Sequence, residues 1–214
     1  MISQRGIKLN YYKVQTSLPF KRLFLESFPN GLATDIARIT HEHWHCHVNK
    51  RQYQGQWQAI ALRCQQQHQQ AHPLLQNFSI EADNENWVNL PALKNSPNVL
   101  ALLNAITAPI RSVRLMKLAP NSSILPHCDS ELGAQFGAAR LHVPISGQLG
   151  VEFWLEGELV PMRTNELWYL DTNRPHWVDH RGSEPRINLV IDCLMSPWLQ
   201  RQLDGSKTIS PTVP

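Results

Sequence analysis

The sequence lacks the features that mark several special classes of protein. It has no apolar run long enough to span a bilayer, and residues 1–14 lack the apolar region of a secretory signal. Lys and Arg never form a run of five or more, so nothing favours a nucleic-acid or membrane-surface partner. The four cysteines show no CxxC spacing, which is typical of reduced thiols. We therefore expect a cytoplasmic protein.

Internal repeats are also absent, and so is any linker rich in Gly, Ser or Pro that would divide the chain. The 214 residues are 42% hydrophobic and 17% charged, which is typical of a globular domain that buries its own core. We predict a single domain over residues 1–214. Within it we expect a helical and irregular part at 1–110, a β core at 111–195 and a C-terminal tail at 196–214.

The N-terminal part has mixed periodicity. Apolar residues within 19–28 recur at helical spacing and predict a short amphipathic helix, and the spacing at 98–107 predicts another. Residues 57–63 favour a short strand. The glutamine-rich stretch 65–76 is interpreted as a surface connection.

From Arg111 onward the pattern changes to short runs rich in Val, Ile, Leu and Trp, separated by Pro, Gly, Asn and Asp. Several short strands at roughly ten-residue spacing are typical of an all-β barrel or sandwich. We predict a mainly β jelly roll with helices packed before it. The expected strands are 112–118, 123–129, 139–145, 151–155, 166–170 and 185–194.

A candidate metal site begins with His127 and Asp129. Residues two apart on a strand share a face, so this imidazole and this carboxylate converge. We expect His176 to supply a third ligand from the turn after a strand. Two histidines and one carboxylate leave open positions, the arrangement of non-haem Fe(II) oxygenases. A plain His–Asp hydrogen bond is the alternative interpretation.

Basic residues near this site predict an anion pocket. Arg186 opens an apolar strand ten residues after His176, and we expect the two to lie on adjacent antiparallel strands. A guanidinium there can hold a carboxylate through two charge-assisted bonds. Arg140 and His142 share one face of their strand. That face either lines the barrel interior or, in the reverse assignment, meets solvent.

Five ordered motifs carry a family resemblance: LPHCD at 125–129, RLHVPI at 140–145, ELWYLD at 166–171, PHWV at 175–178 and RINLVID at 186–192. Together they resemble the aspartyl/asparaginyl β-hydroxylase family, which includes bacterial proline hydroxylases. The similarity is good over residues 112–193 and looser over 44–63.

The resemblance implies a double-stranded β-helix (a cupin-like jelly roll) that binds Fe(II) and consumes 2-oxoglutarate and O2, giving succinate and CO2. It implies that His127, Asp129 and His176 hold the metal. Arg186 would bind the distal carboxylate of 2-oxoglutarate, and further ligand contacts would come from Arg140, His142 and Arg114. His180 departs from the family pattern, which leads us to expect Asn, and we place it at the rim of the site.

The predicted function is therefore hydroxylation of an amino-acid side chain, with a small-molecule or peptide substrate. That substrate would be a free amino acid or a peptidyl residue similar to Asp, Asn or Pro. One alternative is a non-catalytic cupin-like module that binds a small anion or metal. Another is a cupin isomerase or metal-dependent hydrolase, for which Glu166 would be the general base.

Other features have a structural and a functional interpretation. Residues 41–47 alternate His41, His43, His45 and His47, which indicates either a second metal site or, more simply, a solvated strand face. Tryptophans on barrel strands either line a substrate pocket or pack in the core; these are Trp154, Trp168 and Trp177. We expect Cys128 to point away from the metal ligands and to pack.

Overall fold

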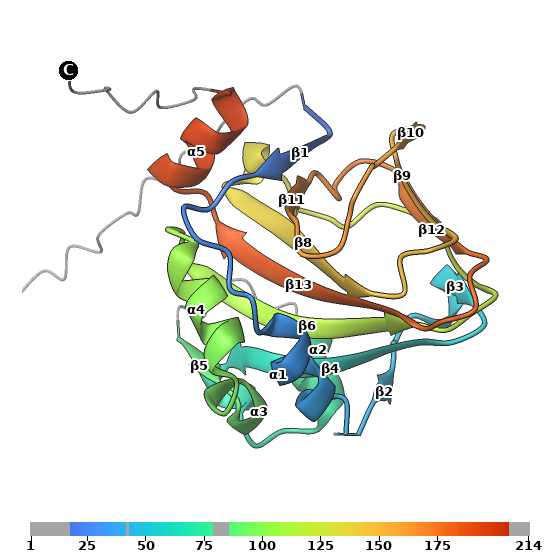
Figure 1. Cartoon of the computed structure of the whole chain (residues 1–214), viewed down its shortest axis with the longest axis horizontal. Coiled ribbons are helices and arrows are strands. Elements are labelled where there is room, and N and C mark those ends of the chain that lie inside the picture. The colour runs from blue at the N-terminus through green and yellow to red at the C-terminus, as the bar shows by residue number, and fades with distance from the viewer. Residues whose placement is uncertain (1–17, 42, 79–85, 206–214) are drawn as a thin grey trace, which may run out of the picture.

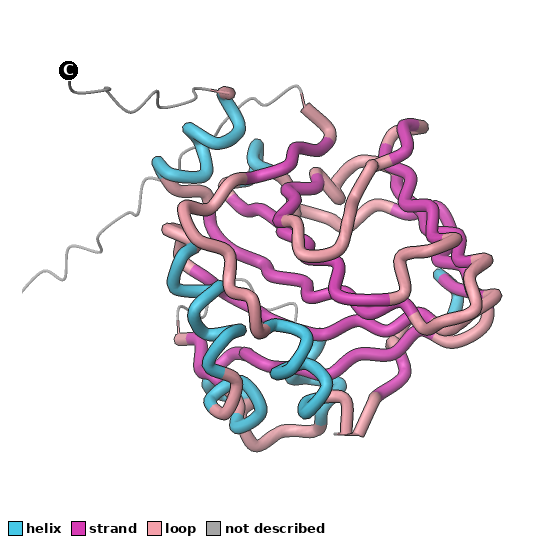
Figure 2. Tube along the Cα trace, viewed as in Figure 1, coloured by secondary structure: helices cyan, strands magenta, loops and turns pink. Residues whose placement is uncertain are grey.

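A computed structural model describes residues 18–41, 43–78 and 86–205. Strands dominate the described chain, and most of the helices lie together at one side (Figure 2). The strands form two antiparallel sheets. The larger sheet has the order β1-β11-β8-β13-β6-β4-β2, with β5 paired to β4, and the smaller has the order β10-β9-β12-β7-β3.

The larger sheet consists of β1 (Phe20–Leu23), β2 (His45–Cys46), β4 (Trp57–Gln65), β5 (Trp87–Asn89), β6 (Ile110–Leu118), β8 (Ala138–Ser146), β11 (Leu167–Leu170) and β13 (Arg186–Leu194). The smaller sheet consists of β3 (Tyr53–Gln54), β7 (Ser122–His127), β9 (Val151–Leu155), β10 (Glu158–Leu159) and β12 (His176–His180).

From β6 to β13 the chain passes repeatedly between the two sheets (Figure 1). Strands β6, β8, β11 and β13 lie in the larger sheet, whereas β7, β9, β10 and β12 lie in the smaller one. This alternation defines a double-stranded β-helix and confirms the predicted jelly roll. Face-to-face closure of the sheets protects most strand edges and leaves an interior between them.

Helices cover the outer face of the larger sheet (Figure 1). Leu115, Leu141 and Leu189 project outward from β6, β8 and β13 into a core that also contains Ile36 and Leu102. A second, smaller core lies between the sheets. The helices are α1 (Leu32–Ile39), α2 (Pro73–Phe78), α3 (Pro91–Lys94), α4 (Pro97–Ala105) and α5 (Pro197–Asp204), with 3-10 turns at Lys50–Gln52, Gln66–His68 and Ala134–Phe136.

Because helices bury the outer face, the apolar side of β8 is not the barrel interior. Leu141 and Val143 contact the helical layer, whereas Arg140 and His142 line the interior. The polar face of β8 therefore points inward, so the reverse assignment of this strand is wrong.

No helix among the described residues is long and apolar enough to cross a membrane.

The N-terminal part contains more strand than we expected. The predicted helix at 19–28 is wrong: Phe20–Leu23 is strand β1, which pairs with β11 in register Phe20↔Leu170. Strands β2 to β5 also join the two sheets. The strand expected at 57–63 and the helix expected at 98–107 are confirmed as β4 and α4. The single-domain assignment of residues 1–214 stays a prediction.

Candidate metal centre

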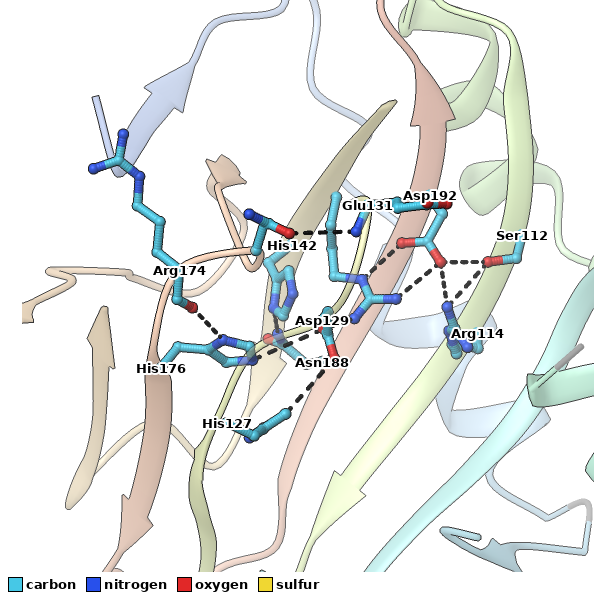
Figure 3. Close-up of polar contacts among 12 residues, drawn as sticks. Ser112, Arg114, His127, Asp129, Glu131, His142, Arg174, His176, Asn188 and Asp192 are labelled. Atoms are coloured by element: carbon cyan, nitrogen blue, oxygen red, sulfur yellow. Dashed lines mark hydrogen bonds and ion pairs between the residues drawn. The ribbon is translucent and has the colours of Figure 1, made fainter. Parts of the chain in front are cut away.

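Two histidines face each other across the smaller sheet. His127 ends β7 and His176 begins β12, and the two are direct register partners with ring centroids 4.2 Å apart. The Nδ1 atom of His127 lies 2.7 Å from the carbonyl oxygen of Leu125, and that of His176 lies 3.0 Å from the carbonyl oxygen of Arg174. These contacts orient both rings, and each Nε2 faces Asp129 (Figure 3).

Asp129 completes a group of three potential metal ligands. Its Oδ1 lies 3.7 Å from Nε2 of His127, and its Oδ2 lies 3.8 Å from Nε2 of His176. One ligand atom from each residue falls within 4.8 Å of the others, and this is the only such group among the described residues. Two imidazoles and one carboxylate on one face leave further coordination positions open.

The electrostatics of His176 and Asp129 suit metal binding, because a ligand must be deprotonated. Burial lowers the pKa of His176 to about 4, so its ring is neutral at neutral pH. Burial alone would raise the pKa of Asp129, but the Arg140 guanidinium and the neighbouring histidines outweigh that effect and lower it. Asp129 is therefore a carboxylate.

A cluster of charges adjoins the triad. Arg140 donates from Nη1 to Oδ2 of Asp129, and from Nε and Nη2 to Asp192 at 2.7 and 3.0 Å. Asp192 also accepts from Nη2 of Arg114 and, at 2.8 Å, from Oγ of Ser112 (Figure 3). Burial would raise the pKa of Asp192, but Arg140 and Arg114 hold it well below its usual range.

A further cation, Arg186, lies near the ring of Phe153, on which His176 also stacks. The Arg186 guanidinium stands 5.8 Å from the Phe153 centroid, and the ring of His176 stacks on Phe153 at 5.9 Å. Asn188 Nδ2 lies 2.7 Å from Nδ1 of His142. Burial lowers the pKa of Arg186 to about 10, so it remains a cation at neutral pH. In the described chain, Nε and Nη2 of Arg186 and Nε2 of His142 have no hydrogen-bond partner.

One cavity of about 560 Å³ brings together all the residues that we predicted to bind the metal or the co-substrate: Arg114, His127, Asp129, Arg140, His142, His176 and Arg186. Three details of their placement differ from expectation. His176 opens strand β12 instead of lying in a turn, and Asp129 lies two residues beyond the end of β7. His176 and Arg186 are not on adjacent strands, because β12 and β13 belong to opposite sheets.

Sequence reasoning missed part of the cavity wall. His47, of the alternating histidines, lines the cavity and stacks on Trp57 with ring centroids 3.6 Å apart. Burial lowers the pKa of His47 to about 3. Gln65 and Gln76, which we assigned to a surface connection, also line the cavity, as does Trp87. Among the described residues of this histidine stretch only His45–Cys46 forms a strand, so the strand on which the four histidines would share a face is not seen there.

Several side chains do not have the positions we expected. Glu166 does not line the cavity; it accepts from Trp168 Nε1 at 3.0 Å and pairs with Arg22, which removes the base required by an isomerase or hydrolase. His180 is buried at the far end of β12, where its Nε2 lies 2.8 Å from the carbonyl oxygen of Glu184. It therefore lies away from the rim of the cavity.

The structure also gives the positions of the three tryptophans and of Cys128. Trp168 is core, whereas Trp154 and Trp177 stack on each other at 5.8 Å, and none of the three lines the cavity. Cys128 is exposed and borders the cavity, so the expectation that it packs is wrong.

L-proline cis-4-hydroxylase of Rhizobium meliloti (strain 1021) is 28% identical over 141 residues, which cover 64% of this chain and 48% of that protein. The match thus spans about half the length of the relative.

Two solved structures are also similar. A 2OG-Fe(II) oxygenase family oxidoreductase from Burkholderia pseudomallei has a TM-score of 0.46 at 14% identity and covers 74% of this chain and 78% of its own. A non-heme alpha ketoglutarate dependent epimerase from nogalamycin biosynthesis has a TM-score of 0.47 at 12% identity and covers 82% and 78%.

A family model described as aspartyl/asparaginyl beta-hydroxylase matches residues 32–196, well over half of the chain. That range includes every residue of the triad, the Arg140–Asp192–Arg114 cluster and Arg186. The chain belongs to the aspartyl/asparaginyl β-hydroxylase family.

Proposed function

We propose that this protein is a dioxygenase that uses Fe(II), 2-oxoglutarate and O2 to hydroxylate an amino-acid side chain. Family membership supports this function, and so does the similarity to a protein named L-proline cis-4-hydroxylase. The four cysteines are free thiols, which is consistent with a cytoplasmic setting.

His127, Asp129 and His176 fit Fe(II) by their chemistry. Two neutral imidazoles and one carboxylate are the donor set of non-haem Fe(II) oxygenases, and their ligand atoms lie within 4.8 Å of one another. When bound, the iron would supply the oxidising chemistry with 2-oxoglutarate and O2. The contribution of the chain is to orient the two rings through backbone carbonyl groups and to keep Asp129 ionised.

The observation that carries the proposal is the state of Arg186. This guanidinium is 4% exposed, yet its Nε and Nη2 have no partner within the described residues. A buried cation with unpaired donor atoms costs free energy, so an anion bound beside Arg186 would be stabilising. The distal carboxylate of 2-oxoglutarate provides one that can accept two parallel bonds. The Phe153 ring is near both the Arg186 guanidinium and the His176 ring, so these two groups border the same part of the cavity, which suits a short dicarboxylate reaching from the guanidinium to the metal.

The other three residues predicted to contact the ligand are His142, Arg140 and Arg114, and they differ in how many of their polar atoms already bond to other residues. Nδ1 of His142 pairs with the Asn188 amide, whereas Nε2 has no partner among the described residues, so Nε2 is the ring atom left for the co-substrate. Arg140 and Arg114 are bonded to Asp192. Their predicted contacts with co-substrate or substrate therefore use only the donors that remain.

The remaining cavity wall is aromatic and amide-rich, with His47, Trp57, Trp87, Gln52 and Gln76 among its residues. Flat aromatic faces and neutral hydrogen-bonding groups suit a compact polar substrate. We propose a free amino acid or a peptidyl residue similar to Asp, Asn or Pro.

Succinate release tests the proposal. Purified protein with Fe(II), ascorbate and 2-oxoglutarate is screened in air against L-proline, other free amino acids and short peptides containing Asp, Asn or Pro. We expect at least one substrate to raise succinate formation above the uncoupled rate and to gain one oxygen atom by mass spectrometry. His176→Ala should abolish both signals. Metal and 2-oxoglutarate binding without turnover on any substrate would instead favour the non-catalytic binding module.

A further inference from the structure

The carboxylate of the triad is less constrained by its own backbone than the two histidines. His127 and His176 lie on paired strands, and each ring is oriented by a main-chain carbonyl two residues earlier. Asp129 follows the end of β7, and the side chain is 24% exposed. Its backbone N–H bonds to the carbonyl oxygen of Thr172, but that bond does not fix the carboxylate.

Arg140 is the side chain that holds this carboxylate. Its Nη1 donates to Oδ2 of Asp129, and the alternative contacts of Oδ1 and Oδ2 are only the histidine nitrogens at 3.7 and 3.8 Å. A guanidinium on one oxygen leaves the other oxygen for a metal ion. The orientation of Asp129 therefore depends on where Arg140 is held.

Asp192 in turn holds Arg140. The two are direct register partners on β13 and β8, and Asp192 accepts from both Nε and Nη2 of Arg140. On its other side, β13 has a register shift against β6 between Ile191 and Cys193, so Asp192 lies at a bulge. Bulges next to active sites commonly redirect a side chain. Here the bulge lets Asp192 also accept from Arg114 and Ser112 of β6.

We propose that Asp192 is a positioning residue for the metal centre, acting on Asp129 through Arg140. The inference rests on the proposed metal-binding function. Asp192 is not itself a metal ligand. In this proposal it fixes Asp129, the one member of the triad that lies outside a strand and is not oriented by a backbone carbonyl group. It also explains why a buried carboxylate takes four donor contacts, from Arg140 twice, from Arg114 and from Ser112.

Charge makes the arrangement depend on Asp192. Arg114 is a buried cation and Arg140 is a partly buried one, and Asp192 bonds to both of them. Asp192→Asn keeps the size of the side chain but removes the negative charge and one of the two acceptor oxygens. The two guanidinium groups would then repel each other, and Arg140 would lose the bidentate contact that aims it at Asp129.

The test measures Mn(II) affinity, because Mn(II) suits the same ligands and free Mn(II) is quantified by electron paramagnetic resonance. We expect Asp192→Asn to weaken Mn(II) binding by about 10- to 100-fold, the usual effect of removing an outer partner of a metal ligand. Asp35→Asn is the matched control: Asp35 is likewise a buried carboxylate that accepts several bonds, but it does not line the cavity. The control should keep wild-type affinity.

Two further measurements separate positioning from loss of stability. In an Arg140→Ala background, Asp192→Asn should cause no additional loss of Mn(II) affinity, because the path through Arg140 is already broken. The visible spectrum of Co(II)-loaded protein should change in Asp192→Asn and match wild type in Asp35→Asn. If Asp192→Asn does not fold, Ser112→Ala removes one donor without changing charge and should produce a smaller loss in the same direction.

Wild-type affinity in folded Asp192→Asn, or in Ser112→Ala if that is the variant that folds, would overturn the inference and leave the proposed metal centre standing. An equal additional loss in the Arg140→Ala background would also overturn it, because Asp192 would then not act through Arg140. Absence of Mn(II) binding by the wild-type protein would overturn the proposed function itself, together with the inference.

Discussion

Arg186 is the residue whose loss should weaken 2-oxoglutarate binding most directly. Arg186→Ala removes a buried cation whose Nε and Nη2 have no other partner in the described chain. A charged hydrogen bond contributes about 1.5–3 kcal/mol, so affinity for 2-oxoglutarate should fall by roughly 10- to 150-fold. Isothermal titration of Mn(II)-loaded protein measures this. Arg181→Ala, an exposed arginine in the connection between β12 and β13, serves as the control, and equal affinities in the two variants would contradict the assignment.

The sequence was informative for those site residues whose position follows from local spacing. His127 and Asp129 are two residues apart, and Arg186 opens an apolar strand, so both features are visible in the sequence. Asp192 has no such mark, because its role arises from a bulge and from partners on β6 and β8. His47 has the same difficulty: its contact with Trp57 depends on β2 lying beside β4.

At the scale of elements, Asp35 joins two helices and should matter for stability alone. It is fully buried in α1, and its carboxylate accepts from the backbone N–H groups of Asn98 and Val99 at 2.6 and 3.2 Å. Ser96, the N-cap of α4, makes no side-chain cap bond itself. Asp35→Ala should therefore lower the free energy of unfolding by about 1–3 kcal/mol. Urea denaturation measures this loss, and an unchanged midpoint would show that Asp35 does not cap α4.

The elements that the sequence predicted well are those with strong local patterns. Strands β6, β8, β9 and β13 have apolar residues on at least one face, so their runs stand out. Strand β1 was predicted as a helix because its pairing with β11 lies far away in the sequence and outweighs local periodicity. Strand β12 was overlooked, although His176, Val178 and His180 alternate as buried positions with half-buried neighbours.

For the whole molecule, we predict that the metal-free protein loses stability as pH falls below about 6.5. Burial lowers the pKa of three cavity histidines: to about 4 for His176, to about 3 for His47 and well below the usual range for His142. Between pH 6.5 and about 4 the unfolded chain binds protons that the folded chain does not. Each histidine then lowers stability by up to about 1.4 kcal/mol per pH unit.

The two cavity carboxylates do not reverse this sign. Asp129 and Asp192 have lowered pKa values in the fold, so their contribution is present above the unfolded value of 3.8 and is lost only below it. Urea unfolding of metal-free protein at pH 7 and pH 5 is the measurement. The midpoint should be lower at pH 5, and Mn(II) at pH 7 should raise it, because binding stabilises the folded state alone. An equal or higher midpoint at pH 5 would contradict the burial of neutral histidines.

We propose that the triad and Arg186 together hold Fe(II) and 2-oxoglutarate in one cavity. The most direct measurement is an anaerobic titration of metal-free protein with Fe(II) and then with 2-oxoglutarate, followed by visible absorption. We expect a weak charge-transfer band of the chelated complex to appear in wild-type protein and to be absent in His176→Ala. We also expect Arg186→Ala to need a much higher concentration of 2-oxoglutarate to reach the same absorbance. Absence of the band in folded wild-type protein would contradict the proposed binding of Fe(II) and 2-oxoglutarate in this cavity.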